Sequence, residues 1–263
     1  MQLKQLELEG GGTLTVYLRD SCERMPKAID RPLVLVVPGG GYTHVSAREG
    51  DPVALQFAAA GYHAAVLDYA ICEQAKDGLP LRQLAQAIGL VRQHAAGWHI
   101  LPEKIAVCGF SAGGHLALSG AVLDIPGERA QPRPDAVILG YPVITAETGV
   151  THAGSFEHLC GHFPLTADEE AQFSCDRLVR DDTPPTFLWH TAADKTVPVA
   201  NSLRYAAALA AHGVPFELHV YPFGWHGLST ADAETAANPL PKNIQPVHGW
   251  LADAVRFLGD VLA

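Results

Sequence analysis

Short hydrophobic runs of strand length recur along the chain, separated by longer stretches with helical periodicity. Uninterrupted apolar runs are typical of parallel strands that are buried on both faces. Two early segments, Leu3–Glu9 and Thr13–Leu18, alternate with period two around three glycines, which predicts an antiparallel hairpin at a sheet edge. Six later runs are predicted as strands: Leu33–Val37, Ala64–Leu67, Ile105–Cys108, Ala136–Leu139, Phe187–Trp189 and Glu217–Tyr221.

Helical stretches separate the later strands. Asp51 supplies an N-cap, Pro52 stands at the first helical position, and Gly61 ends that helix. Leu81–Ala96 carries apolar residues at helical spacing. Three further helices are predicted over Ala112–Leu123, Asn201–His212 and Val247–Leu262. Strands alternating with helices predict the α/β class: a mostly parallel central sheet of about eight strands with helices on both faces.

Residues 145–182 interrupt this alternation. The segment is rich in His, Thr, Asp and Glu, and it is long for a connection in a compact domain. We interpret it as a small cap or lid inserted above the sheet. The whole chain, residues 1–263, is then one domain, which its length allows for an α/β protein.

Composition narrows the set of partners. Of the 263 residues, 48% are hydrophobic, so a large core is available and disorder is excluded as the dominant state. The formal charge of −10 argues against nucleic acid and an anionic membrane surface, since both require clustered Lys and Arg. The apolar C-terminal helix is compatible with either a core position or a homo-oligomer interface.

The expected compartment is the cytoplasm. The N-terminus has no apolar run of signal-peptide length, and no window is long enough for a spanning helix. An odd, widely spaced set of cysteines without a CxxC pair is typical of reduced thiols. The five are Cys22, Cys72, Cys108, Cys160 and Cys175.

The most informative stretch surrounds Ser111. Gly109-Phe-Ser111-Ala-Gly113 matches G-x-S-x-G and lies between an apolar strand and an apolar helix. A serine at such a turn sits in strained backbone, and the helix N-terminus beneath it favours developing negative charge. We therefore predict Ser111 as a nucleophile rather than as a mere helix cap.

An acid and a histidine are expected later in the chain, each just past a strand end. Asp194 follows the strand ending at Trp189, on the same edge as Ser111, whereas Asp181 and Asp182 precede that strand. His226 directly follows the last strand. The other histidines are less suitable: His219 lies within that strand, His212 ends a helix and His248 opens one. Ser111, Asp194 and His226 are the predicted triad.

The glycines after the first parallel strand supply candidates for an oxyanion hole. In Pro38-Gly-Gly-Gly-Tyr42 the backbone N–H groups can approach a substrate oxygen. Gly40 and Gly41 are the predicted donors, together with the N–H of Ala112. No phosphate-loop or dinucleotide pattern is present, so neither of these alternatives explains the glycines.

With these motifs the chain resembles the α/β-hydrolase superfamily. It is most similar to bacterial carboxylesterases related to acetyl-xylan esterases and the hormone-sensitive-lipase-like group. The resemblance rests on the glycine loop, the Ser111 turn and the Asp68-Tyr69 pair, and covers about residues 30 to 263. It implies the α/β-hydrolase fold and ester hydrolysis without metal or cofactor, and it supports the assigned triad and oxyanion donors. Pro38 replaces a histidine of that group, so the loop has to be held differently.

These observations predict a serine carboxylesterase whose partner is a small-molecule ester. Short acyl groups, chiefly acetyl, are expected because no long apolar lid is present; a sugar as the alcohol is implied by the resemblance alone. Two alternatives remain: a peptidase of the prolyl-oligopeptidase-like type, and a catalytically inactive binding module of the same fold.

Three residue groups near the predicted site have less certain roles. His152, His158, Cys160 and His162 cluster in residues 145–182, but their spacing matches no standard zinc pattern, so we expect no metal. Cys108 is expected in the core. Tyr42 and Trp225 flank the predicted site and are compatible with either pocket lining or packing.

Overall fold

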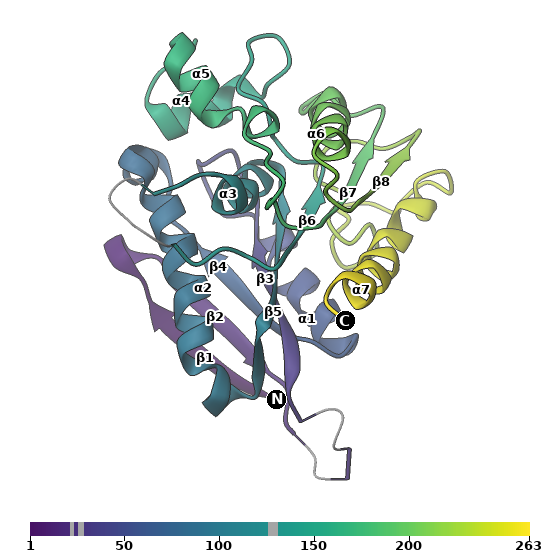
Figure 1. Cartoon of the computed structure of the whole chain (residues 1–263). Coiled ribbons are helices and arrows are strands. Elements are labelled where there is room, and N and C mark those ends of the chain that lie inside the picture. Colours follow the sequence, from purple (N-terminus) through teal and green to yellow (C-terminus); the bar gives the residue numbers. More distant parts are fainter. Residues whose placement is uncertain (22–23, 26–28, 126–130) are drawn as a thin grey trace.

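The computed structural model describes residues 1–21, 24–25, 29–125 and 131–263 (Figure 1). Cys22, one of the cysteines behind the reduced-thiol prediction, lies outside these residues. The four described cysteines are free thiols. No helix in the described ranges combines the length and hydrophobicity needed to cross a membrane.

The centre of the molecule is a single mixed sheet with the strand order β1-β2-β4-β3-β5-β6-β7-β8. The strands span β1 (Gln2–Glu7), β2 (Thr13–Leu18), β3 (Arg31–Val37), β4 (His63–Asp68), β5 (Ile100–Phe110), β6 (Ala136–Gly140), β7 (Thr186–Thr191) and β8 (Phe216–Tyr221). β1 and β2 form the predicted antiparallel edge, and every pair from β4 to β8 is parallel. The carboxyl ends of the parallel strands therefore meet at one edge, where the candidate residues follow them.

Two hydrophobic layers cover the sheet. The helices flanking it are α1 (Asp51–Ala59), α2 (Leu79–Trp98), α3 (Ser111–Val122), α6 (Ala200–Ala211) and α7 (Trp250–Val261). One layer contains α2, α3 and α6, and the other α1 and α7 (Figure 1). In β3, Leu33 and Leu35 enter the first layer and Val34 and Val36 the second, all fully buried. Each such side chain contributes about 2 kcal/mol of hydrophobic stabilisation. The predicted fold class is confirmed.

Several helix boundaries differ from the sequence expectation, and α1 and α2 give two examples. Asp51 is the first residue of α1 and not its N-cap, which is Gly50; its carboxylate instead accepts a hydrogen bond from Tyr17 on β2. α2 continues past the expected end at Ala96 to Trp98, and His99 closes it in the left-handed conformation. The local sequence predicts that Asp51 caps the helix, but its carboxylate is bound by Tyr17 from a distant strand.

Residues 145–182 contain two helices that the polar composition did not reveal: α4 (Ala153–Cys160) and α5 (Ala167–Phe173). We call residues 145–182 the α4–α5 segment. Phe156 and Leu159 bury the apolar side of α4, and α5 begins with a capping box between Thr166 and Glu169. α4 packs against η4 (Cys72–Gly78), beside the sheet's carboxyl edge. The interpretation as one domain with a cap stays a prediction.

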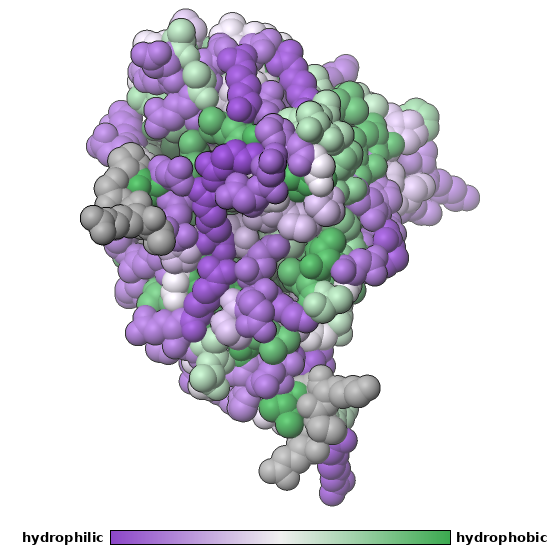
Figure 2. Space-filling view, viewed as in Figure 1, coloured by the Kyte–Doolittle hydropathy of each residue, from purple (hydrophilic) through white to green (hydrophobic). Residues whose placement is uncertain are grey.

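Short 3-10 helices complete the described elements: η1 (Glu9–Gly11), η3 (Ala47–Glu49), η5 (Cys175–Arg177) and η6 (Gln245–Gly249). Figure 2 shows hydrophilic side chains over much of the visible face, with a hydrophobic area over α6, where Leu203 is half exposed. A homo-oligomer stays a prediction.

Candidate active site

Ser111 stands at the sharp turn between the central strand β5 and α3. Its φ is 52°, in the left-handed region that a serine rarely occupies. The flanking glycines make the turn possible. A Cβ on Gly109 would lie 2.4 Å from the Gly113 carbonyl oxygen, and a Cβ on Gly113 would lie 2.2 Å from that of Pro38. The G-x-S-x-G spacing is therefore required by close backbone packing between β5, α3 and the loop after β3.

Asp194 lies just beyond β7 and is buried. Its Oδ1 accepts hydrogen bonds from the backbone N–H groups of Thr196 (2.8 Å) and Val197 (3.0 Å). Burial by itself would raise the pKa of Asp194, but the His190 and His226 imidazoles, with the Val197 N–H, hold this pKa well below its usual value. The side chain is therefore a carboxylate throughout the physiological range.

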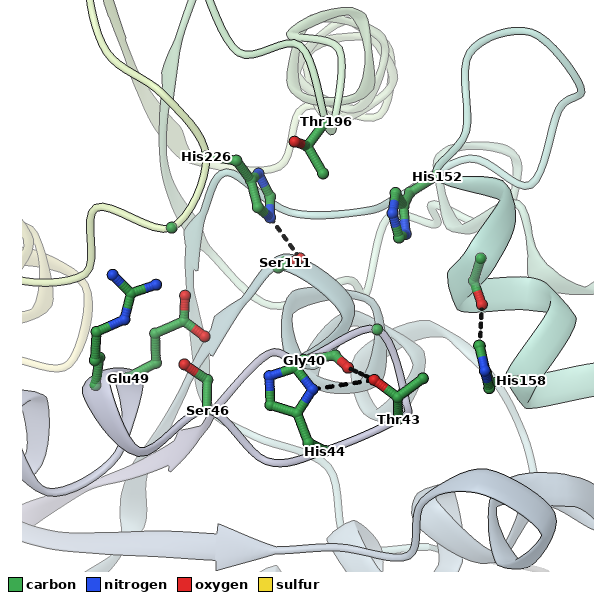
Figure 3. Close-up of a pocket in the computed structure, with 14 residues that line it drawn as sticks. Gly40, Thr43, His44, Ser46, Glu49, Ser111, His152, His158, Thr196 and His226 are labelled. Atoms are coloured by element: carbon green, nitrogen blue, oxygen red, sulfur yellow. Dashed lines mark hydrogen bonds between the residues drawn. The ribbon is translucent and has the colours of Figure 1, made fainter. Parts of the chain in front are cut away.

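His226 connects Asp194 to Ser111. Its Nδ1 lies 2.7 Å from Asp194 Oδ2, and its Nε2 lies 2.8 Å from Ser111 Oγ (Figure 3). Because a carboxylate only accepts hydrogen bonds, Nδ1 carries the proton and Nε2 accepts one from the serine hydroxyl. The ring of Tyr141 packs edge-on against the imidazole, 5.0 Å between centroids. The structure thus brings together the three side chains predicted from sequence.

The glycine loop lies beside Ser111 with unusual backbone geometry. Gly40 and Gly41 have φ values of 126° and 64°. A Cβ on Gly40 would lie 2.0 Å from the carbonyl oxygen of His44, so only glycine fits there. Within the described residues neither glycine N–H donates a backbone hydrogen bond. The N–H of Ala112, in the first turn of α3, has no intrahelical acceptor. All three predicted donors are available to an oxyanion.

The loop is held without the histidine found in the resembling group. Tyr69 donates a hydrogen bond from its hydroxyl to the Pro38 carbonyl oxygen at 2.8 Å. The N–H of Gly39 donates to Glu49 Oε2, also at 2.8 Å. The Asp68-Tyr69 pair that contributes to the resemblance therefore has a structural function, because its tyrosine supports the loop.

Glu49 is a buried carboxylate that sequence reasoning missed. Tyr141 donates to its Oε1 at 2.6 Å, and the Tyr141 oxygen accepts from the Ser229 N–H at 2.9 Å. Burial and the Glu49 charge raise the pKa of Tyr141, so the phenol keeps its proton. Together with Gly39, these contacts connect the glycine loop, the end of β6 and the loop carrying His226. A lone glutamate in a short loop gives no sequence signal that separates it from a solvated side chain.

The pocket above Ser111 has a volume of about 310 Å³. None of its fourteen lining residues carries a hydrocarbon side chain, and its only rings are imidazoles. His152, from the α4–α5 segment, and His226 lie on either side of Ser111 in Figure 3, with His44 below. The site therefore places the Ser111 hydroxyl, hydrogen-bonded to His226, in a small cavity lined by polar residues and glycines.

Known proteins resemble this chain in sequence. The family model BD-FAE matches residues 22–129, which contain the glycine loop and Ser111. Endo-1,4-beta-xylanase B of Butyrivibrio fibrisolvens is 40% identical over 222 residues, which cover 78% of this chain and 34% of that protein. The chain thus spans about a third of the length of this curated relative.

Solved structures match over nearly the whole chain. The acetyl ester-xyloside bifunctional hydrolase from Caldicellulosiruptor lactoaceticus is 38% identical with a TM-score of 0.81, covering 97% of this chain and 89% of that one. The carboxylesterase Cest-2923 from Lactobacillus plantarum is 31% identical with a TM-score of 0.86, covering 99% and 98%. The chain belongs to the α/β-hydrolase family of carboxylesterases. The resemblance inferred from sequence is confirmed, and the chain is a hydrolase that acts on esters.

The aspartates and histidines that the sequence analysis rejected as triad members are bonded to other residues in this esterase. Asp181 pairs with His212, and Asp182 pairs with Arg180. His219, within β8, pairs with Glu217. His248 bonds the carbonyl oxygen of Thr230.

The flanking residues have different positions. Tyr42 is buried behind the glycine loop, where its hydroxyl bonds His115, whereas Trp225 lines a separate pocket next to the first. Cys108 is buried, and burial raises its pKa, as suits a core thiol. His158 bonds the Gly154 carbonyl.

His162 pairs with Glu169 on the surface of the α4–α5 segment. Over the described ranges no group of three or more His, Cys, Asp or Glu side chains is arranged to hold a metal ion.

Proposed function

We propose that this esterase is a serine carboxylesterase that removes short acyl groups, chiefly acetyl, from a small alcohol or sugar. The main support for this proposal is the chain of hydrogen bonds from Ser111 through His226 to Asp194. Ser111 and His226 line the pocket. A hydroxyl whose proton faces a neutral imidazole, itself oriented by a carboxylate, is the arrangement that generates an oxygen nucleophile.

The first half-reaction forms an acyl-enzyme. Ser111 Oγ attacks the ester carbonyl carbon while His226 Nε2 takes the hydroxyl proton. The tetrahedral intermediate collapses, its bond to the alcohol oxygen breaks, and Nε2 returns the proton to the departing alcohol. Asp194 stays ionised throughout and stabilises the imidazolium. In the second half-reaction water replaces the alcohol, and the carboxylic acid leaves.

The negative charge of each intermediate falls on the former carbonyl oxygen. The N–H groups of Gly40, Gly41 and Ala112 are the donors that face it. Deleting one such donor in other enzymes costs about 3–4 kcal/mol of transition-state stabilisation. Here Gly40 and Gly41 have positive φ and Ala112 lies in the first turn of α3, so little reorganisation is required when the charge develops.

The preference for short acyl groups follows from the lining of the pocket. A longer acyl chain gains affinity only by burying methylenes against apolar surface, at about 0.8 kcal/mol each. The pocket holds about 310 Å³, and its side chains are those of Thr, Ser, His, Arg and Glu, with no hydrocarbon side chain among them. The same groups suit the hydroxyls of a sugar, in keeping with the acetyl ester-xyloside hydrolase to which the chain is similar.

The test is hydrolysis of p-nitrophenyl acetate, butyrate and octanoate by the wild type and by Ser111→Ala. We expect the rate to fall from acetate to octanoate, and the variant to lose at least about 10⁴-fold in kcat, as in other serine hydrolases. Full activity in the variant, or a rate that rises with chain length, would overturn the proposal.

Covalent labelling separates the two remaining alternatives. A fluorophosphonate should label Ser111 in the wild type, whereas a catalytically inactive binding module would stay unlabelled. A peptidase would be labelled but would cleave peptide amides faster than acetate esters. The polar pocket favours the esterase over both.

A further inference from the structure

A second pocket of about 200 Å³ adjoins the one above Ser111. Its walls include the indole of Trp225 and the side chains of Thr235, Asn238 and Leu240. Arg48 and Gly227 line both pockets, so the two are adjacent. The proposed acetyl-ester chemistry uses the first pocket and leaves the second without a function.

In the proposed mechanism, the second pocket lies next to the residue that protonates the departing alcohol. Its residues Trp225 and Gly227 are the immediate neighbours of His226, which returns the proton to the alcohol oxygen. The oxyanion donors Gly40 and Gly41 line only the first pocket. A group attached to the alcohol can therefore extend past His226 into the second pocket while the acyl carbonyl stays at the glycine loop.

Arg48 is held in place but has no carboxylate partner. Its carbonyl oxygen accepts a hydrogen bond from Ser229 Oγ, which fixes η3 to the loop that carries His226. Most arginines of this acidic chain form ion pairs, but Arg48 forms none with any described residue. The Glu49 carboxylate beside it is bonded to Gly39 and Tyr141 instead. A guanidinium that lines a pocket and has no carboxylate partner among the described residues is suited to bidentate binding of a carboxylate.

Trp225 supplies an aromatic wall in the same pocket. The side chain is 49% exposed, so the ring is accessible to a ligand in this pocket. The flat face of a sugar ring packs well on such a surface, and the Asn238 amide offers both a donor and acceptors for hydroxyls. Phe223, two residues earlier in the loop, is equally exposed but lines neither pocket.

We propose that the Arg48–Trp225 pocket binds a carboxylate-bearing sugar unit, a uronic acid, linked to the acetylated sugar. This inference rests on the proposed function and extends it. The uronic acid ring stacks on Trp225, and its carboxylate pairs with Arg48. The preferred substrate is then an acetylated oligosaccharide with a uronic acid next to the esterified unit.

The experiment compares two acetylated disaccharides that differ at one carbon. In one the unesterified sugar is glucose, and in the other it is glucuronic acid; acetate release gives kcat/KM for each. We expect the wild type to prefer the glucuronic acid compound by roughly tenfold, the effect of one charge-assisted hydrogen bond. Arg48→Gln should bring the ratio close to one, and Arg48→Lys should restore part of it. Trp225→Ala should lower both values and leave the ratio unchanged.

Two variants control for general effects. Phe223→Ala removes an exposed aromatic side chain from the same loop. Lys195→Gln removes one positive charge close to Asp194 but outside both pockets. Both should keep the wild-type ratio. A wild-type ratio of one, or a ratio that Arg48→Gln leaves unchanged, would overturn the inference. Hydrolysis of p-nitrophenyl acetate distinguishes failure of this inference from failure of the proposed function. If the enzyme hydrolyses this ester but does not prefer the glucuronic acid compound, only the uronic acid subsite is disproved. If it does not hydrolyse the ester, the proposed function is disproved.

Discussion

The loops at the carboxyl edge of the sheet and the α4–α5 segment both contribute to the pocket, but they are built differently. At the sheet edge, Gly40 and Ser111 have left-handed backbone, and the packing leaves no room for a Cβ on Gly40. In the α4–α5 segment, His152 and His158 hydrogen bond to Ser155 and Gly154 in their own helix. The groups proposed for chemistry are fixed by contacts between distant segments. The groups that shape the cavity depend on local contacts, and they can change without moving the triad.

One residue connects the two regions. His115, on α3, accepts a hydrogen bond from the Tyr42 hydroxyl at Nδ1 and donates one from Nε2 to the Phe173 carbonyl oxygen, both at 3.0 Å. Tyr42 follows the oxyanion glycines, and Phe173 ends α5. The buried imidazole of His115 thus attaches the α4–α5 segment to the carboxyl edge of the sheet.

The largest effect should follow a substitution at the rigid edge. In Gly40→Ala the new methyl group would overlap the carbonyl of His44, so the loop has to shift and its N–H donors move. We expect kcat/KM for p-nitrophenyl acetate to fall by about 100- to 1000-fold, the effect of losing an oxyanion donor. Fluorophosphonate labelling of Ser111 should slow by a similar factor.

Gly61→Ala is the matched control. Gly61 also has a positive φ, 114°, but no atom lies near its added Cβ, and it is remote from the pocket. The expected result is a stability loss of about 1–2 kcal/mol with normal activity. Equal losses of activity in both variants would mean that strain in general, and not the position of the donors, reduces catalysis.

Acid should weaken the attachment between the two regions. Burial lowers the pKa of His115 to about 4. The unfolded chain, where histidine titrates near 6.5, therefore binds more protons than the folded one between pH 6.5 and 4. The free energy of unfolding should fall by roughly 3 kcal/mol across this interval as the pH is lowered. Urea titrations at several pH values measure it.

His115→Gln tests the origin of this dependence. Glutamine keeps one donor and one acceptor but cannot be protonated, so the variant should show a much shallower slope. A smaller slope should remain from His63 and His152, because burial also lowers the pKa of each. An unchanged slope in the variant would assign the acid sensitivity to other groups.

The smallest effect is expected in the α4–α5 segment. His152 lies over the glycine loop, with its Cε1 3.8 Å from a Cβ placed on Gly41. His152→Ala should enlarge the pocket and raise kcat/KM for butyrate relative to acetate by up to about tenfold, as for one or two added methylenes. Glu157→Ala, an exposed site on the same helix, should leave the ratio unchanged. If His152→Ala lowered kcat/KM for p-nitrophenyl acetate as much as Gly40→Ala does, the division between the two regions would be wrong.

Strand periodicity and strand-end motifs predicted most of the fold and the candidate site. Buried parallel strands leave uninterrupted apolar runs, and the G-x-S-x-G turn requires glycines that no other residue can replace. Ser111, Asp194 and His226 could be chosen because each follows a predicted strand, and the structure brings their side chains into contact.

What the sequence did not reveal depends on contacts between distant segments. Glu49 and Tyr141 are 92 residues apart, and neither stands in a recognisable motif. The helix α4 is short, so its local sequence only weakly indicates a helix. Packing against η4 stabilises it. The second pocket combines Arg48 with Trp225, from loops that meet only after the sheet has formed. The N-cap interpretation of Asp51 failed for the same reason, since Tyr17 on β2 binds the carboxylate.

The order of the proposed catalytic groups along the chain affects how the enzyme is made. Ser111 follows the central strand β5, whereas His226 comes 115 residues later, after the edge strand β8. A growing polypeptide therefore contains the glycine loop and the serine turn well before the histidine leaves the ribosome. Its serine lacks a proton acceptor until β8 pairs with β7. On the proposed mechanism, a growing chain therefore gains esterase activity only after β8 and the loop that carries His226 have been made.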